Sequence, residues 1–406
     1  MNSEERNEHA VGPLEGLRVL DLAGEIGIYC TKLMADLGAD VIKVEKPDGD
    51  ETRDLPPFFH DEPDPRKSLF FQLYNTSKRG ITLELSSSDG RELFKKLAAK
   101  ADIIVETFRP GHMENLGLGY ETLEKLNKGL VMASITPFGQ TGPYRDYKAS
   151  DLTGGAMGGI VYTTGEPDRE PLRPGGSEAY HMASYIACMA ILIAVNYRDI
   201  SGSGQHIDVS MQEAIAGEME SYSSWFLYQD LLWQRYGAGI PHVVPSNLFP
   251  CKDGYVHIIS GGAGQWPALV EWIGDERLLD PKFVDGKIRI ENRELVDTAI
   301  GEWTSNFTRQ ELFHEGQRRR IPIGPCQNAK DIAEDPHLAA RGFFVEIEHP
   351  ELGHLTYPGA PYIFHETPWK ISRVAPSLRE HNKEIYCGEL GLSPEELVML
   401  KVAGTI

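Results

Sequence analysis

Apolar residues in the first third of the chain occur in short runs, separated by segments in which they recur at helical spacing. The runs are rich in leucine, isoleucine and valine, which is typical of buried strands; they cover residues 17–24, 39–47, 80–85, 102–108 and 129–139. The intervening segments 27–37 and 87–101 predict helices. Alternating strands and helices indicate βαβ units and a parallel sheet covered on both faces. We therefore expect an α/β fold with a Rossmann-like large domain.

The second half of the chain changes its pattern twice. An apolar run from Met182 to Val195 is shorter than the ~20 residues that a membrane span needs, so we expect a core helix there. A strand, a glycine-rich loop and a helix then predict a smaller α/β domain, before hairpin-like strands close the chain. The expected bounds are 1–215 for the first part of the large domain, 216–240 for a linker, 241–324 for the small domain and 325–406 for the return to the large domain.

Charge and cysteine usage narrow the class of protein. The 406 residues carry a formal net charge of -20, which argues against nucleic acid or an anionic membrane as a partner. The five cysteines are scattered singly, without a CxxC motif or a cluster with histidine, so neither a metal site nor a disulfide framework is indicated. Single thiols and a polar N-terminal segment unlike a signal peptide favour a cytoplasmic protein.

Basic residues stand near the ends of several predicted strands. If they gather at one rim of the sheet, they can bind phosphate groups there; otherwise they are ordinary surface charges. These residues are Lys46, Arg53, Lys78, Arg79 and Arg109. A nicotinamide dinucleotide is disfavoured, because the glycines of the first predicted strand–helix turn lack the G-x-G-x-x-G spacing.

A second candidate is the glycine loop of the small domain, Gly261, Gly262 and Gly264, followed by Gln265. Glycines let a ligand approach closely, and their backbone N–H groups can stabilise an oxyanion. The alternative is a flexible turn without a ligand.

The start of the long apolar helix carries further candidate chemistry. Ser177 is a suitable N-cap, Glu178 falls in the first turn, and Tyr180 and His181 follow. A carboxylate near a helix N-terminus is favoured by the helix dipole. From the residues alone, a capped helix start is favoured over a catalytic corner.

Eight segments, in this order, resemble the class III CoA-transferases, a family that includes formyl-CoA and carnitine CoA-transferases. The resemblance extends from about Leu14 to about Phe364. The segments are LEGLRVLDLAG, YCTKLMADLGADVIKVEKPDGDETR, NTSKRGITLEL, ADIIVETFRPG, ITPFGQTGPYRDY, TTGEPD, SGSGQHIDVSMQEA and DPHLAARGFF. The resemblance implies a Rossmann-like large domain made from both chain ends, a small domain, and two chains threaded through each other as an interlocked dimer.

The resemblance also implies a reaction. CoA moves from an acyl-CoA donor to a carboxylic acid, with coenzyme A esters as substrates and no bound cofactor or metal. An aspartate attacks the thioester to form a mixed anhydride, and the CoA thiolate then converts it to an aspartyl-CoA thioester, which the incoming acid consumes. Family positions for CoA are kept in this chain, including Phe108 and the glycine loop. The kept basic positions are Lys46, Arg53, Lys78, Arg79 and Arg109.

The family nucleophile is missing. Counting without gaps from Gly165 forward or from Gln205 backward places Tyr180 where the family has its aspartate. A phenol cannot form the thioester intermediate, and its pKa of ~10 leaves little phenolate at neutral pH. Glu178 lies two positions away. Thr107 and Asn115, in the fourth segment and just after it, also depart from the family pattern.

The resemblance therefore favours a heteromeric enzyme in which a homologous subunit carries the active aspartate, as an interlocked heterodimer or heterotetramer. The chain is similar to the subunit without a nucleophile in the succinyl-CoA:benzylsuccinate CoA-transferases of anaerobic toluene degradation. Two alternatives stay open: a self-sufficient homodimer that uses Glu178, and a CoA-binding or scaffold protein without transferase activity.

Overall fold

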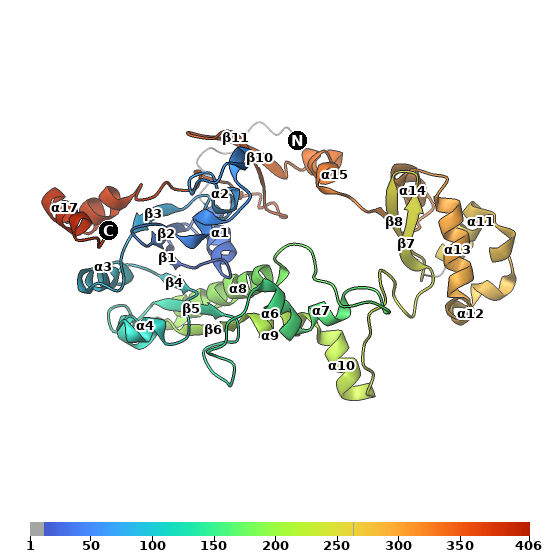
Figure 1. Cartoon of the computed structure of the whole chain (residues 1–406), viewed down its shortest axis with the longest axis horizontal. Coiled ribbons are helices and arrows are strands. Elements are labelled where there is room, and N and C mark those ends of the chain that lie inside the picture. Colours follow the sequence, from blue (N-terminus) through green and yellow to red (C-terminus); the bar gives the residue numbers. More distant parts are fainter. Residues whose placement is uncertain (1–11, 263) are drawn as a thin grey trace. The chain divides into compact units, whose positions relative to one another are not determined.

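The computed structural model describes residues 12–262 and 264–406 and divides the chain into two compact units. The large unit runs to Ile160 and includes Pro174–Ser223 and Ala340–Ile406, so both chain ends contribute to it. The smaller unit contains Val161–Arg173 and Ser224–Ala339. Figure 1 shows the elements of each unit in the colours of the sequence.

A six-stranded parallel sheet forms the centre of the large unit. Its order is β3 (Arg79–Thr82), β2 (Asp40–Glu45), β1 (Arg18–Leu22), β4 (Ile103–Glu106), β5 (Val131–Thr136) and β6 (His206–Ser210). This order is that of doubly wound α/β folds, in which ligands bind where the order reverses, between β1 and β4. The predicted parallel sheet and α/β class are confirmed; β6 was not predicted.

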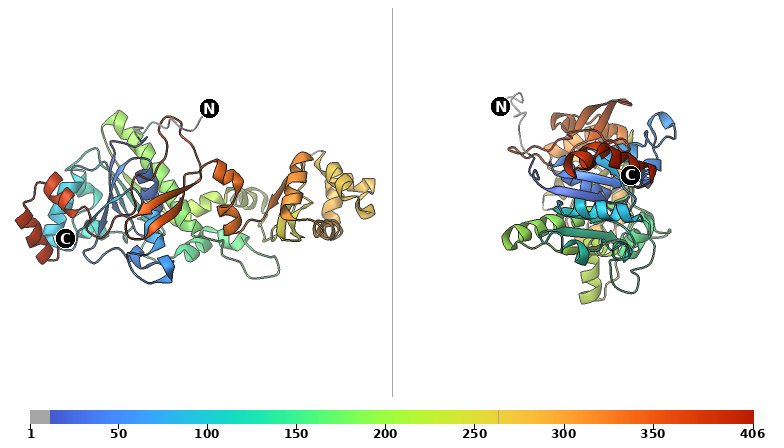
Figure 2. Two further views of the ribbon diagram at one scale, coloured as in Figure 1. Left: turned by 90° about the horizontal axis from the view of Figure 1, so that it is seen from above. Right: turned by 90° about the vertical axis from the view of Figure 1, so that its left-hand side faces the viewer.

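Alternate residues of each strand enter two separate cores, because successive side chains of a strand point to opposite faces. Val19 packs with α1 (Ile28–Asp36) and α8 (Glu178–Ser201) on one face. Leu20 packs with α3 (Ser88–Ala98) and with Tyr386, from the C-terminal segment, on the other face. In Figure 2 the red C-terminal elements lie against blue and cyan N-terminal ones.

The helix α8 contains the apolar run Met182–Val195. Among the described residues it is the one helix long and apolar enough to cross a membrane. Ala183, Ala187 and Ile191 are fully buried, in the core that α8 shares with α1 and β5. The expectation of a core helix is therefore confirmed.

The remaining elements of the large unit are short. Its other helices are α2 (Leu69–Tyr74), α4 (His112–Asn115), α5 (Tyr120–Leu123), α6 (Asp151–Gly158), α9 (Met211–Glu218) and α17 (Pro394–Val402), with a π-helical segment at Lys383–Glu389. The predicted C-terminal hairpin forms as β10 (Phe344–His349) and β11 (Gly353–Pro358). Leucines of α17 pack on the same core as α3, and Figure 1 shows the two helices side by side.

The smaller unit has its own core and an antiparallel sheet of β7 (Ser246–Cys251), β8 (Gly254–Ile259) and β9 (Ile323–Pro325). Four helices follow or precede these strands: α11 (Gln265–Ile273), α12 (Gly286–Glu291), α13 (Arg293–Thr304) and α14 (Arg309–Arg318). Shorter helices are α15 (Ala329–Ala333) and α16 (Pro336–Ala340). Where the chain passes from one unit to the other, it forms α7 (Ile160–Thr163) and α10 (Glu220–Gln229).

Candidate functional site

A pocket of about 530 Å³ opens at the carboxyl ends of β1 to β4. Gly24 lines it from the end of β1, Lys46 from β2, Ser86 from the segment after β3, and Thr107 and Phe108 from the end of β4. The carboxyl ends of parallel strands on either side of the point where the strand order reverses are the usual ligand position in doubly wound sheets. The pocket is therefore the first candidate for a binding site in the large unit.

Lys46 and His112 line this pocket, and Arg109 follows Phe108, which lines it too. Lys46 and Arg109 are exposed. Burial lowers the pKa of His112, and the charges of Arg109 and Lys46 lower it further, which indicates that the three groups lie close together. The ring of His112 also packs on Phe108, with 4.6 Å between centroids. His112 was missed from the sequence, since nothing in the four-residue helix α4 marks it as a ligand contact.

Arg53 is held inside the protein. Its guanidinium donates to both carboxylate oxygens of Glu45, at 2.7 and 2.8 Å, and lies 3.7 Å from the ring centroid of Phe71. Glu45 is the acid at the end of β2, where a dinucleotide fold would bind ribose. In this structure that carboxylate is bound by Arg53.

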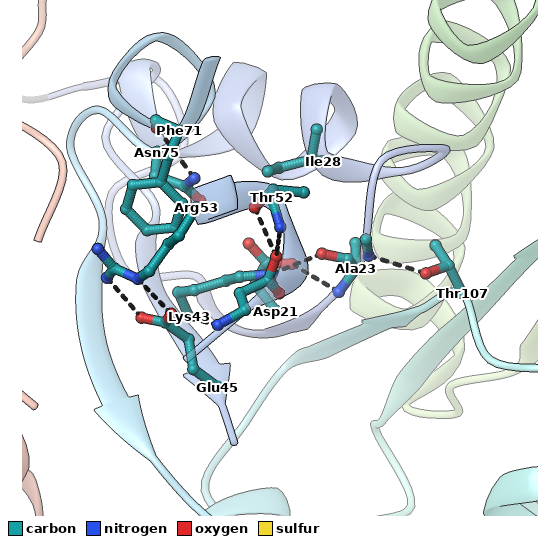
Figure 3. A network of polar contacts seen from close by, with 12 residues as sticks. Asp21, Ala23, Ile28, Lys43, Glu45, Thr52, Arg53, Phe71, Asn75 and Thr107 are labelled. Atoms are coloured by element: carbon teal, nitrogen blue, oxygen red, sulfur yellow. Dashed lines mark hydrogen bonds and ion pairs between the residues drawn. The ribbon is translucent and has the colours of Figure 1, made fainter. Parts of the chain in front are cut away.

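Lys78 lies beneath the turn between β1 and α1. Its ammonium donates to Asp21 at 2.8 Å, Thr31 at 2.9 Å and Asn75 at 3.0 Å, and its side chain is fully buried. Burial lowers the pKa of Lys78 to about 8, although Asp21 opposes the shift. Figure 3 shows Asp21 beneath this turn. Lys78 does not line the pocket, because its donors all face inward.

Arg79 begins β3 and therefore lies at the amino end of the sheet, the opposite edge from the pocket. Its guanidinium donates to Asp40, Glu384 and Glu389, at 2.6 to 2.9 Å. The expectation that the basic residues gather at one rim is wrong for Arg79. The reason is that Arg79 is the first residue of its strand, whereas Lys46 and Arg109 follow theirs.

A second, much smaller cavity, of about 10 Å³, lies at the start of α8. Glu25, Tyr29, Tyr74, Tyr180 and His181 line it. The Tyr74 hydroxyl and His181 Nε2 form a hydrogen bond of 2.8 Å, and the rings of Tyr29 and His181 are 4.9 Å apart. We call this group the aromatic corner. It leaves little free space around Tyr180.

Acidic residues surround the phenol of Tyr180. Burial raises its pKa, and the charge of Glu25 raises it further, while a backbone hydrogen bond with Asp151 opposes the shift; the charges of Asp151 and Glu51 make smaller contributions that raise it. The pKa of Glu25 is also raised, first by burial and then by Glu51 and Asp151. Glu25 was missed as a candidate, because it reaches the corner from the β1–α1 turn, far from Tyr180 in sequence.

The start of α8 is capped from another helix. Asp151, the first residue of α6, accepts hydrogen bonds from the backbone N–H groups of Ala179, at 2.9 Å, and Tyr180, at 3.2 Å. Ser177 occupies the N-cap position but makes no side-chain capping bond, so the expected local cap is wrong. A carboxylate satisfies the orphan donors of a helix start better than a hydroxyl because it also interacts with the dipole. Glu178 is exposed in the first turn and does not line the small cavity.

The glycine loop belongs to the smaller unit, between β8 and α11. The Gly262 N–H donates to Oε1 of Gln265 at 2.7 Å. Gly264 has a φ of +87°, which favours glycine, and a Cβ on Gly261 would lie 3.1 Å from Val243. In the structure the side chain of Gln265 therefore occupies the Gly262 N–H group that a ligand would need.

The pattern of CoA-transferase family III matches residues 14–382. The chain belongs to this family. It is 35% identical to the succinyl-CoA–D-citramalate CoA-transferase of Chloroflexus aurantiacus, over 97% of this chain and 98% of that protein. It is 36% identical to subunit BbsE of the succinyl-CoA:(R)-benzylsuccinate CoA-transferase of Thauera aromatica, over 91% and 93%. A solved structure of a CAIB/BAIF family protein from Brucella suis superposes with a TM-score of 0.84 at 33% identity, covering 93% of this chain and 99% of that one.

Membership of the family makes CoA thioesters the substrates, and the chemistry requires no cofactor. In residues 12–262 and 264–406, no three histidine, cysteine, aspartate or glutamate side chains gather in a way that could hold a metal ion.

Proposed function

We propose that this chain is a subunit of a heteromeric CoA-transferase whose homologous partner carries the nucleophilic aspartate. The single observation behind the proposal is Tyr180, which stands at the family's nucleophile position by sequence and lines a nearly filled cavity. The transfer requires a carboxylate that becomes first an anhydride and then a thioester. A half-buried phenol with a raised pKa supplies neither intermediate.

The open pocket is the proposed CoA site. Lys46 and Arg109 offer positive charge for its phosphates, the neutral ring of His112 can form a hydrogen bond, and Phe108 offers an aromatic face. The net charge of -20 makes such a local basic group necessary for an anionic ligand. Arg53 supports this site indirectly, by holding Glu45 in the pocket wall. Lys78 supports it by holding Asp21 beneath the turn.

The proposed partner is a homologous chain, interlocked with this one. A stripe of exposed apolar residues runs along α8 at intervals of about one turn, with exposed fractions from 47% to 81%. The stripe comprises Tyr185, Met189, Ile193, Tyr197 and Ile200. Contiguous apolar surface of this kind marks interfaces with other proteins. The similarity to a protein named as a subunit, BbsE, supports a partner from the same family.

We propose succinyl-CoA as the donor, because the names of the two relatives above include it, and a dicarboxylic acid such as benzylsuccinate as the acceptor. The glycine loop of this chain, Gly261, Gly262 and Gly264, would cover the thioester in the partner's site, with Gln265 moving aside to release the Gly262 N–H. The free thiols of the five cysteines are compatible with a cytoplasmic enzyme.

The test is to assay the purified chain alone and after co-expression with a homologue that has an aspartate in a G-D-x-x-x-G stretch. Succinyl-CoA and a panel of dicarboxylic acids serve as substrates, and native mass spectrometry reports the assembly. We expect no transfer by the chain alone and transfer by the complex. Turnover by the single chain that Glu178→Gln abolishes would instead establish the self-sufficient homodimer. A complex that is no faster than the partner alone would leave this chain a scaffold.

A further inference from the structure

The turn between β1 and α1 forms part of the wall of the open pocket. Hydrogen bonds from side chains hold its backbone groups. The N–H of Ala23 donates to Oδ1 of Asp21 at 2.9 Å. The carbonyl of Ala23 accepts from Nζ of Lys43 at 2.5 Å. Both Asp21 and Lys43 are fully buried, so these two bonds form beneath the turn, away from solvent (Figure 3).

The next donor along the turn, the N–H of Gly24, is held from a different strand. It donates to Oγ1 of Thr107 at 2.8 Å. Thr107 follows β4, and Leu22 of β1 is paired with Glu106 of β4, so this bond continues the pairing of the two strands beyond their last backbone partners. It also crosses the point where the strand order reverses, between β1 and β4.

Close contacts surround the side chain of Thr107. A Cβ built on Gly27 would come within 2.8 Å of its methyl group and 3.0 Å of Ile135, so the methyl is packed tightly against the start of α1. A Cβ built on Gly24 would lie 3.4 Å from the hydroxyl oxygen of Thr107 and 3.4 Å from Glu51 Oε1. Packing of the methyl therefore directs the hydroxyl to the Gly24 N–H.

Thr107 and Gly24 both line the open pocket, next to each other. We propose that Thr107 is a positioning residue that fixes the β1–α1 turn as the pocket wall, and that its hydroxyl is needed for tight binding of the CoA thioester. This proposal rests on the assignment of the pocket to CoA. Phe108, the adjacent residue, is fixed by the same segment, since its N–H donates to Glu106 at 2.7 Å.

The test compares Thr107→Val, which keeps the shape and removes the acceptor, with Thr107→Ser, which keeps the acceptor. Thr298→Val, at an exposed threonine of α13 in the smaller unit, is the matched control. Calorimetric titration with CoA measures affinity, and hydrogen exchange of the peptide spanning residues 20–28 measures how firmly the turn is held. We expect Thr107→Val to weaken CoA binding about tenfold, as for a buried donor left without its partner, and to speed exchange in that peptide. The serine variant and the control should stay within about twofold of the wild type.

Equal affinity and equal exchange in the valine variant would overturn the proposal. If that variant fails to fold, Thr107→Ala takes its place with the same expected loss and the serine variant as rescue. A wild-type chain that does not bind CoA would remove the CoA assignment of the pocket and this role of Thr107 with it. Binding by the wild type with no effect of the valine variant would remove the role of Thr107 alone.

Discussion

The open pocket and the aromatic corner share one turn but have opposite character. Gly24 lines the pocket of about 530 Å³, and the next residue, Glu25, lines the corner cavity of about 10 Å³. The pocket is bounded by strand ends, whose side chains spread apart, whereas the corner is filled by large aromatic rings. In this chain, space for a ligand exists in the open pocket and not around Tyr180.

The pocket and the corner also differ in how their acidic side chains are partnered. Two acids of the pocket wall are paired with buried cations, Glu45 with Arg53 and Asp50 with Lys43, while Glu51 and Glu84 also line the pocket. Burial raises the pKa of Asp50, but Lys43 outweighs it and holds the pKa at about 2. In the corner, by contrast, Glu25 has a raised pKa because burial and neighbouring acids oppose its ionised form. Two acids of the pocket are thus paired with cations, whereas Glu25 in the corner is opposed by acidic neighbours.

The largest expected effect concerns the buried ion pair beneath the pocket. Lys78→Met leaves Asp21 buried without its cation, and removing one partner of such a pair costs about 3–5 kcal/mol of unfolding free energy. Urea denaturation measures the loss. The control is Lys330→Met, in an exposed pair with Glu334 at 4.0 Å, which should cost about 0–1 kcal/mol. A loss below about 1 kcal/mol for Lys78→Met would show that the pocket does not depend on this network.

The next effect is a pH dependence of stability from Glu106, at the end of β4. Burial raises its pKa from 4.5 to about 7, against hydrogen bonds from Ser134 and the Phe108 N–H. The folded state therefore binds a proton more tightly than the unfolded state, and stability falls as the pH rises from about 4.5 to 7.

Glu106→Gln replaces the titrating carboxyl group by an amide, so the variant should lack the fall in stability that Glu106 causes as the pH rises. Each tenfold difference in proton affinity between the folded and unfolded states corresponds to about 1.4 kcal/mol of stability. We therefore expect the variant to gain on the order of 2 kcal/mol relative to the wild type between about pH 5 and pH 8. Denaturation midpoints at the two pH values measure the gain. Parallel pH profiles of the two proteins would contradict it.

Sequence and structure agree most where local patterns suffice. The strands β1 to β5 were predicted, since each is a run of buried branched residues. The strand β6, His206–Ser210, was not, because three of its five side chains are not buried and its pattern is weak. The C-terminal hairpin formed as expected, although its two strands lie far along the chain from the sheet.

The sites depend on contacts between distant segments, and there the sequence was less informative. Lys78 and Arg79 are adjacent and looked equivalent, yet one reaches Asp21 and the other Asp40 and Glu384. Their partners come from different strands and from the far end of the chain, so no local spacing reveals them. Glu25 likewise reaches the aromatic corner through the turn geometry alone.

A smaller effect tests the pocket as an anion site. Lys46→Glu replaces an exposed positive charge at the pocket by a negative one, and we expect CoA binding to weaken about tenfold, with the difference shrinking at high salt. Titration with CoA at two ionic strengths measures this. Lys330→Glu, an exposed lysine of the smaller unit, should leave the affinity unchanged. Equal losses in both variants would indicate a general effect of net charge rather than a site.

The smallest expected effect is that of Tyr180→Asp on CoA transfer. This substitution places an aspartate at the position of the family's nucleophile. The new carboxylate would be half-buried beside Glu25, whose charge raises the pKa of the phenol, with the charges of Asp151 and Glu51 adding smaller effects in the same direction. Like charges and burial favour a protonated carboxyl group, and a protonated acid is a poor nucleophile. We therefore expect no CoA adduct in the single variant after incubation with succinyl-CoA, as judged by intact mass spectrometry with hydroxylamine cleavage. The double variant Tyr180→Asp/Glu25→Gln lacks the charge of Glu25, so we expect it to form the CoA adduct under conditions in which the single variant does not. An adduct in the single variant would show that the aromatic corner is as accessible as the pocket.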